Sequence, residues 1–366
     1  MNARERFVNC MHFKEVDRPP WWELWYWKET LERWHDEGLP EDVHLHEYFG
    51  VDRKEGVGVA TGLYPAFKEE TLEETPEYRI FRDGEGVIKK EFKDKLAKLS
   101  MPQFLRHPVE TRQDFEELKK RLNPNSPGRY PLWWEEKKKM WKNRDYPLHI
   151  FAGSLFGWIR DWMGLEQASY TLYDDPGFVD DMMEYLTWFF MTVIKRALEE
   201  VELDYAIFWE DMAYKTGPLI SPQHFKKLMV PRYKRITSLL REHGIDLIFV
   251  DCDGNPSTLI PLWLEGGVNG IYPLERAADM DPVALRKEYG QDLLMMGGID
   301  KRALAQGKDA IDVELAQLPY LFSQGGYISG CDHLVPPDVP LENYLYYLDR
   351  MKELSLRYGG RRGCGV

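Results

Sequence analysis

The chain has 366 residues, of which 43% are hydrophobic and 30% are charged, a composition typical of a folded protein with a sizeable core. Its formal net charge of −13, without a long Lys/Arg cluster, argues against nucleic acid and against a purely anionic membrane surface as partners. The sequence has no apolar run long enough to span a membrane and no apolar signal segment after its charged N-terminus, so we expect a cytoplasmic protein.

The N-terminal part predicts one helix and two strands. Helical periodicity covers residues 2–13. The aromatic run RPPWWELWYW (18–27) is expected to be the first strand, and a second strand is expected somewhere in 56–64.

Residues 65–147 are expected to be an insertion. Within it, YRIFRDGEGVIKKEF (78–92) has two β-type runs around a Gly-rich turn, which predicts a β-hairpin. The segment 93–147, rich in Lys, Pro and Trp, is expected to be an irregular helical excursion.

The second half alternates short apolar runs with helical segments such as 222–244 and 281–290, and this alternation predicts a parallel sheet. The expected strands lie within 146–153, 204–211, 246–253, 268–275, 292–300 and 326–333. With the two earlier strands they make eight, so we predict an α/β fold, one (β/α)8 TIM barrel over residues 1–366 with an N-terminal helix and an inserted hairpin. No GxGxxG follows a strand, which disfavours an open dinucleotide-binding sheet. The tail, 357–366, is expected to be flexible.

A barrel of this kind carries its active site at the carboxyl ends of its strands. The run DLIFV (246–250) is followed by Asp251, Cys252 and Asp253. Because side chains alternate along a strand, Asp251 and Asp253 are expected to share one face while Cys252 faces the other way. We predict that both carboxylates line the mouth of the barrel, although Asp253 could instead cap a turn.

The last expected strand repeats this pattern. If it persists, Ser329, Cys331 and His333 lie on one face, so a thiol and an imidazole would meet the two carboxylates across the mouth. Asp, Cys and His are all competent zinc ligands, which makes Asp251, Asp253, Cys331 and His333 candidate metal ligands. The alternatives are that Cys331 is a small buried hydrophobic residue and that His333 satisfies a loop hydrogen bond.

Glu210 and Asp211 end another strand and point to opposite faces if still extended, so one of them should reach the mouth as an acid or base, together with Asp251, Asp253 and His333. Arg160, after a Gly-containing strand-to-helix turn, could hold a substrate carboxylate, or could pair with a neighbouring acid such as Asp161 or Glu166.

The chain has 13 Trp and 20 Tyr, many of them near expected strand ends. We take Trp25 and Tyr272 as candidate substrate-binding residues in an aromatic-lined pocket; ordinary packing is the alternative for such residues.

Together these strand ends resemble the uroporphyrinogen decarboxylase and cobamide methyltransferase superfamily over nearly the whole chain, and most closely its methyltransferase branch. The matching stretches are RERFVNCMHFKEVDRPP (4–20), GPLISPQHFKKLMVPRYKRI (217–236), DCDGN (251–255), YPLE (272–275), GGID (297–300) and GCDHLVPPDVPLEN (330–343). The resemblance implies a barrel, often dimeric, whose cleft holds a tetrapyrrole or a corrinoid carried by a partner protein.

The chain departs from that pattern at two places. Decarboxylases carry an arginine-containing segment of the form RQAGR after the first strand, where this chain reads ELWYWKE (23–29). The methyltransferases hold zinc with a His-x-Cys pair and a later Cys, where this chain has Asp251-x-Asp253, followed by Cys331 and His333. An oxygen-rich site is less biased toward sulfur substrates than a thiolate-rich one.

Three functions follow from this resemblance. The first is a corrinoid-dependent methyltransferase that moves a methyl group between a small, for example methoxylated, substrate and cobalamin or a corrinoid carrier protein, with zinc as a further cofactor. The second is a decarboxylase of a small or tetrapyrrole carboxylic acid. The third is a corrinoid- or tetrapyrrole-binding protein without catalysis. A homodimer is expected by the same resemblance.

Overall fold

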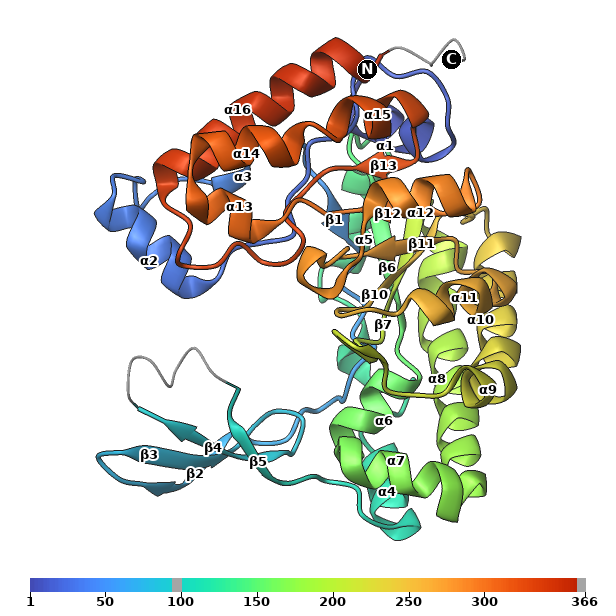
Figure 1. The fold of residues 1–366 in the computed structure, drawn as a ribbon. Coiled ribbons are helices and arrows are strands. Elements are labelled where there is room, and N and C mark those ends of the chain that lie inside the picture. The colour runs from blue at the N-terminus through green and yellow to red at the C-terminus, as the bar shows by residue number, and fades with distance from the viewer. Residues whose placement is uncertain (94–100, 361–366) are drawn as a thin grey trace.

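The computed structural model describes residues 1–93 and 101–360, and its centre is a curled parallel sheet of seven strands (Figure 1). In spatial order the strands are β1 (Glu55–Gly56), β6 (Leu148–Gly153), β7 (Tyr205–Trp209), β10 (Ile248–Asp251), β11 (Gly270–Tyr272), β12 (Leu294–Met296) and β13 (Tyr327–Ile328). All six strands predicted in the second half are present, because strands buried on both faces read as apolar runs. The second predicted strand is present only as the two residues of β1.

The first predicted strand, 18–27, is not a regular strand. Only Tyr26 forms a bridge, parallel to Val335, while the Asp52 backbone N–H donates to the carbonyl of Trp21 at 2.8 Å. The segment therefore lies between β1 and the chain that follows β13, where an eighth strand would stand. Two prolines at 19–20 lack the N–H that a ladder requires. The sheet curls as in a TIM barrel, but a regular closed ladder of eight strands is not found in the part of the chain that the structure describes.

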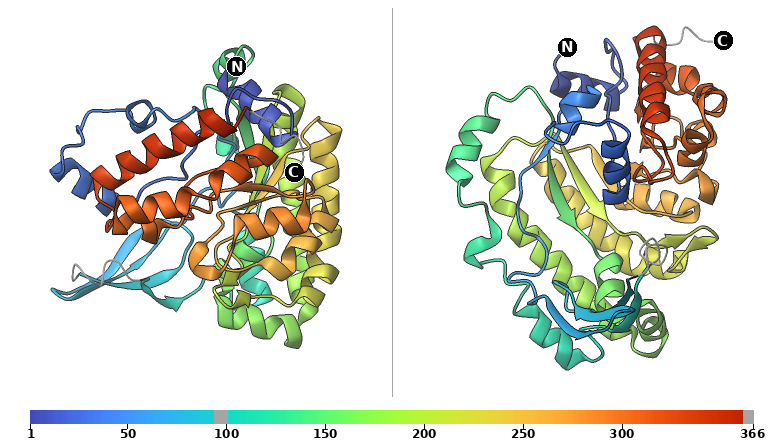
Figure 2. Two further views of the ribbon diagram at one scale, coloured as in Figure 1. Left: turned by 45° about the horizontal axis from the view of Figure 1, so that its top comes forward. Right: turned by 90° about the vertical axis from the view of Figure 1, so that its left-hand side faces the viewer.

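Helices surround the sheet (Figure 2). They are α1 (Ala3–Met11), α2 (Lys28–Asp36), α3 (Leu45–Phe49), α4 (Arg112–Lys119), α5 (Trp134–Trp141), α6 (Phe156–Met163), α7 (Leu165–Asp174), α8 (Pro176–Glu200), α9 (Pro222–His224), α10 (Val230–Glu242), α11 (Ile260–Gly266), α12 (Pro282–Tyr289), α13 (Lys301–Gln306), α14 (Lys308–Leu315), α15 (Leu318–Gln324) and α16 (Leu341–Tyr358). The predicted N-terminal helix is α1. None of the helices described is both long and apolar enough to cross a bilayer.

The expected flexible tail begins inside α16, which runs to Tyr358. Residues 361–366 of that tail lie outside the described residues.

The inside of the curled sheet has its own apolar cluster, separate from the larger core between sheet and helices. Helix α1 places the ring of Phe7 at 4.8 Å from the rings of both Trp22 and Tyr205. Tyr205 in turn packs against Phe249. These rings fill the amino-terminal end of the curl, and the cavity of the described chain that lies inside the curl opens toward the carboxyl ends of the strands.

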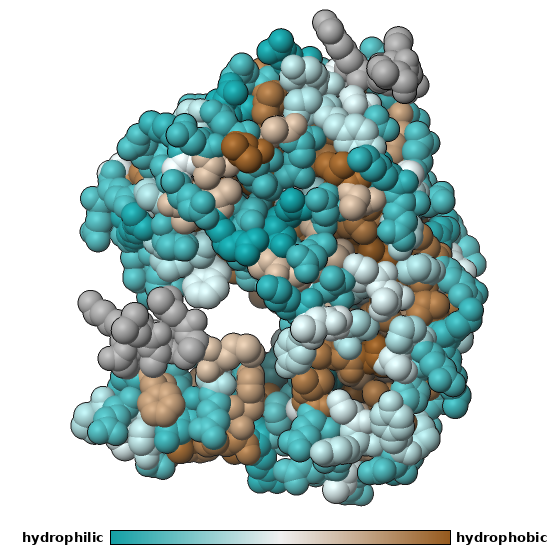
Figure 3. All heavy atoms as spheres, viewed as in Figure 1, coloured by the Kyte–Doolittle hydropathy of each residue, from teal (hydrophilic) through white to brown (hydrophobic). Residues whose placement is uncertain are grey.

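The predicted hairpin is present as β3 (Tyr78–Arg82) and β4 (Ile88–Phe92), and two further strands, β2 (Glu70–Glu74) and β5 (Gln103–Arg106), extend it to a four-stranded antiparallel sheet. This small sheet projects from the body, and an open space lies between it and the upper part of the molecule (Figures 1 and 3). The carboxylate of Glu85, in the hairpin turn, accepts a hydrogen bond from the indole of Trp162 on α6 at 3.2 Å. Since α6 follows the carboxyl end of β6, the small sheet stands beside the carboxyl ends of the parallel strands.

Candidate active site

A cavity of about 400 Å³ opens at the carboxyl ends of the parallel strands. Five strands contribute their last residue to its wall: Trp209, Asp251, Tyr272, Met296 and Ile328. The cavity is within the size range of roughly 300–1,000 Å³ that holds small organic ligands. It therefore occupies the position at which parallel strands of this fold present their chemistry.

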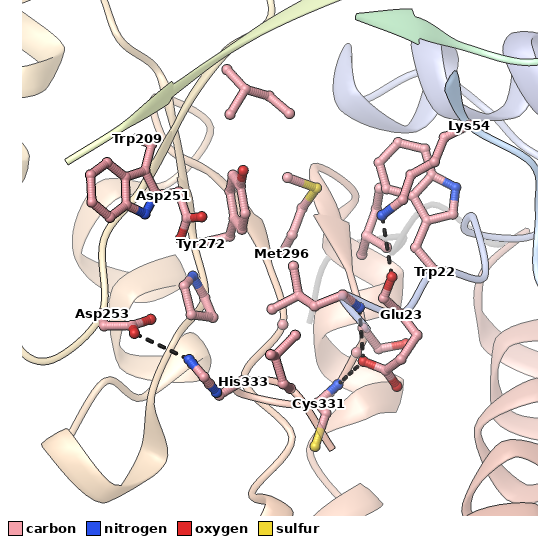
Figure 4. A pocket seen from close by; sticks show the side chains of 18 of the residues that line it. Trp22, Glu23, Lys54, Trp209, Asp251, Asp253, Tyr272, Met296, Cys331 and His333 are labelled. Atoms are coloured by element: carbon pink, nitrogen blue, oxygen red, sulfur yellow. Dashed lines mark hydrogen bonds and ion pairs between the residues drawn. The ribbon is translucent and has the colours of Figure 1, made fainter. Parts of the chain in front are cut away.

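One side of the cavity is acidic (Figure 4). Asp251 and Asp253 both line it, while Cys252 lies on the opposite face, where its Sγ accepts from the Met212 N–H. The alternation predicted for this strand end is therefore correct. Asp253 does not cap a turn; its carboxylate lies 3.1 Å from Nε2 of His333, and this hydrogen bond raises the pKa of His333.

Asp251 differs from its neighbours because its carboxyl group has no hydrogen-bond or ion-pair partner among the described residues. Burial raises its pKa well above the ordinary value, and the nearby carboxylates of Asp253 and Asp211 raise it further. Both effects favour the protonated form of Asp251. The structure thus places a candidate proton donor in the wall of the cavity.

Of the two acids that end β7, Asp211 lines the cavity and Glu210 does not. The Glu210 carboxylate is fully buried on the other face, where it accepts from the backbone N–H of Leu155 (2.9 Å) and Gly157 (2.8 Å) and from the hydroxyl of Tyr233 (2.5 Å). Of the two acids, one of which was predicted to reach the mouth, it is Asp211 that does so. This carboxylate fastens the start of α6 to the sheet.

Arg160 does not line the cavity either. Its guanidinium donates to the backbone carbonyl of Asp211, lies 3.3 Å from the Asp211 carboxylate, and pairs with Asp161 at 3.0 Å. The alternative that it pairs with a neighbouring acid is the correct one, because its donors are already used. Arg160 holds Asp211 in place, at a positive φ of 39° that non-glycine residues rarely adopt.

The two aromatic residues predicted to bind substrate lie in different places. Tyr272 lines the cavity, but Trp25 is 44% exposed and lies outside it, with its ring 5.5 Å from that of His46. Trp22 and Trp209 line the cavity instead.

The four predicted metal ligands do not form a metal site. The thiol of Cys331 is fully buried and its sulfur points away from Asp253 and His333 (Figure 4). Strand β13 ends at Ile328, so the alternation assumed through His333 does not apply. Within 1–93 and 101–360, no three or more His, Cys, Asp or Glu side chains are grouped as a metal ion requires. The residues present therefore do not fit the family's zinc ion.

The opposite side of the cavity carries three groups that the sequence did not single out: Glu23, Lys54 and His149. Burial raises the pKa of Glu23 to about 7 and lowers the pKa of Lys54 to about 8. Burial, together with the charge of Lys54, lowers the pKa of His149 to about 4. In the sequence, Glu23 is distinguished only as a single acid inside an otherwise aromatic and apolar run. No local sequence pattern distinguishes Lys54 or His149 as residues of the site.

Comparison with known proteins agrees with this architecture. The family model "Uroporphyrinogen decarboxylase (URO-D)" matches residues 94–354. Among curated proteins, the chain is similar to the uroporphyrinogen decarboxylase of Syntrophotalea carbinolica. The two are 28% identical over 144 residues, which cover 38% of this chain and 39% of that protein. It is also similar to that of Legionella pneumophila (strain Lens), with 23% identity over 143 residues, 39% of this chain and 40% of that protein. The matches thus span about two fifths of these relatives' length.

Among solved structures, a methyltransferase from Methanosarcina mazei superposes with a TM-score of 0.62 at 14% identity, covering 96% of this chain and 98% of that one. At this identity the likeness shows a shared fold. Since the family model spans well over half of the sequence, the chain belongs to the uroporphyrinogen decarboxylase (URO-D) family.

Proposed function

We propose that this protein is an enzyme that demethylates a small methoxylated aromatic compound and passes the methyl group to a corrinoid. The observation that carries the proposal is the Asp251 carboxyl group, which is partly buried, without a partner among the described residues, and set in a cavity walled by Trp22, Trp209 and Tyr272. Breaking an aryl methyl ether requires a proton or a Lewis acid on the ether oxygen. In this proposal Asp251, whose protonated form is favoured by burial and by the neighbouring carboxylates, supplies that proton beside the aromatic rings.

In this scheme the ring of the substrate packs among the aromatic side chains and its ether oxygen faces Asp251. As the methyl carbon leaves, both electrons of the carbon–oxygen bond stay on the oxygen, and Asp251 donates its proton there, so that a neutral phenol is released. General acid catalysis of this kind contributes typically ~100- to 10,000-fold in rate.

The proton of Asp251 is then replaced from the neighbouring His333–Asp253 pair. The side chains of this pair are 28% and 35% exposed, which gives them access to solvent. Their hydrogen bond keeps His333 protonated at a higher pH than an ordinary histidine, because it raises the pKa of the imidazole. The His333–Asp253 pair can therefore transfer protons from solvent to Asp251.

The corrinoid, when supplied at the open rim by a carrier protein or as free cobalamin, would provide the electron-rich cobalt that accepts the methyl group. A cavity of about 400 Å³ holds an aromatic ring and its substituents, so the cavity residues bind the substrate and not the macrocycle. No step is assigned to zinc, since the side chains do not fit it.

A second candidate function is decarboxylation of a small carboxylic acid. Family membership and the ammonium group of Lys54 in the cavity wall favour it. The carboxylate of Asp253, together with the Asp211 side chain, makes the same cavity a poor host for a polyanionic tetrapyrrole, because like charges repel at short range.

The test incubates the purified protein with cob(I)alamin and neutral methoxybenzene, and follows loss of the cob(I)alamin absorbance together with phenol by chromatography. Asp251→Asn should lower the rate ~100-fold, while the matched variant Asp181→Asn, at a side chain that is 68% exposed, should not change it. In parallel, release of carbon dioxide from benzoic acids is measured. Carbon dioxide without demethylation would favour the decarboxylase.

A further inference from the structure

Lys54 lies directly before β1, and its ammonium group faces the side of the cavity opposite the aspartates. Nζ donates to the backbone carbonyl of Glu23 at 3.2 Å and stands 4.7 Å from the centre of the Trp22 ring. No acid of the described chain forms an ion pair with it. A partly buried lysine without an ion-pair partner is costly for the fold, and such charges are usually matched by an opposite charge.

Against the effect of burial, the charge of Glu23 acts on Lys54 from a distance and raises its pKa, but this carboxylate forms no ion pair with the ammonium group. The carboxylate of Glu23 accepts from the backbone N–H of Cys331 at 2.9 Å and of Leu24 at 3.1 Å, and from the Tyr344 hydroxyl at 3.4 Å. The other groups that face Lys54 carry no negative charge: Trp22 is apolar, and His149 is neutral at pH 7 because burial and Lys54 lower its pKa to about 4. Among the described residues Lys54 thus donates only to the Glu23 carbonyl, and no carboxylate forms an ion pair with its ammonium group.

The two ends of the cavity are chemically opposite. Figure 4 shows Lys54 and Trp22 at one end and Asp251, Asp253 and Trp209 at the other, with Tyr272 and Met296 between them. A flat ligand that spans this space meets a cation at one end, aromatic and thioether surfaces along its length, and a proton donor at the far end. Such an arrangement orients an asymmetric ligand, since an anionic group is repelled from the aspartates and attracted to Lys54.

We propose that Lys54 binds a carboxylate of the substrate, so that the substrate is an aromatic carboxylic acid that carries its methoxy group at the Asp251 end. This inference rests on the proposed function for the identity of the reacting group, but the carboxylate subsite is defined by Lys54 alone. A point charge of this kind distinguishes an anion from a neutral ligand of the same shape.

The experiment measures binding and requires no turnover. Quenching of tryptophan fluorescence, checked by calorimetry, gives the Kd of 4-methoxybenzoate and of its neutral counterpart 4-methoxybenzamide. The wild-type protein should prefer the benzoate at least tenfold. Lys54→Gln should abolish the preference and Lys54→Arg should retain it, while Lys28→Gln, at a side chain that is 84% exposed, should leave both Kd values unchanged.

Equal affinity of the wild-type protein for the two probes, binding of neither, or a preference that survives in Lys54→Gln would overturn the carboxylate subsite. Circular dichroism of each variant shows that the fold is intact, and if Lys54→Gln does not fold, the Lys54→Met variant takes its place. The outcome is separable from that of the proposed function: charge-selective binding without demethylation would leave the subsite standing and reject the methyl transfer. Demethylation of neutral methoxybenzene without charge selectivity in binding would support the methyl transfer and reject the carboxylate subsite.

Discussion

The most informative perturbation is Glu210→Gln, because it separates the structural role of this carboxylate from the catalytic role that its position at a strand end suggests. Its two oxygens receive two backbone N–H groups at 2.9 and 2.8 Å and the Tyr233 hydroxyl at 2.5 Å, all of them buried. A glutamine offers one carbonyl oxygen, and its NH2 group would face a donor. At least one buried donor is then left without an acceptor, at about 1–3 kcal/mol, and the remaining bonds lose their charge assistance.

We therefore expect Glu210→Gln to lower the free energy of unfolding by about 3 kcal/mol. Urea unfolding followed by circular dichroism should show this as a midpoint shift of ~1 M. The control is Glu199→Gln on α8, where the side chain is 53% exposed, with an expected change below about 0.5 kcal/mol. An unchanged midpoint together with a loss of activity would refute this reasoning, since it would mean that the carboxylate acts on substrate.

Four further outcomes are expected. Asp251→Asn should reduce demethylation ~100-fold without lowering stability in urea, because the carboxyl group that it replaces makes no hydrogen bond to the described residues. Because burial raises the pKa of Glu23 from 4.5 to about 7, the folded state binds this proton more tightly than the unfolded chain. The free energy of unfolding should then fall as the pH rises from about 4.5 to about 7, by up to about 3 kcal/mol, and Glu23→Gln should remove this slope in urea titrations. Asp253→Asn should lower the pKa of His333 in NMR titrations, since the carboxylate is what raises it; an unchanged pKa would contradict the pair. Treatment with EDTA should leave the melting temperature and the activity unchanged, and a metal found at one equivalent per chain by elemental analysis, with activity lost on its removal, would contradict the geometry.

Much of the site could be predicted from local patterns. The six apolar runs predicted six parallel strands because a sheet covered on both faces needs apolar residues at every position. Polar residues that end such runs meet at one edge of the sheet, so Asp211, Asp251, Asp253 and His333 line one cavity as the order of the elements implies. The period-two alternation also assigned the opposite faces of Asp251 and Cys252 correctly.

The alternation of side chains between the two faces of the sheet applies only within the strands. Strand β13 ends at Ile328, so the direction of Cys331 depends on a turn and not on the pleat. The choice between Glu210 and Asp211 was left open by the pattern; it depends on the positive φ at Asp211, which the contacts with Arg160 hold in place.

The sequence by itself thus determined the family, the order of strands and helices, and the edge of the sheet at which the acids gather, because these depend on residue patterns a few positions long. Only the tertiary structure decided which acids have partners and which do not. Glu23 and Lys54 lie 31 positions apart and meet because an irregular segment fills the eighth position of the curled sheet. The charge of a buried group depends on the side chains packed over it from other elements, and those neighbours are known only once the chain is folded.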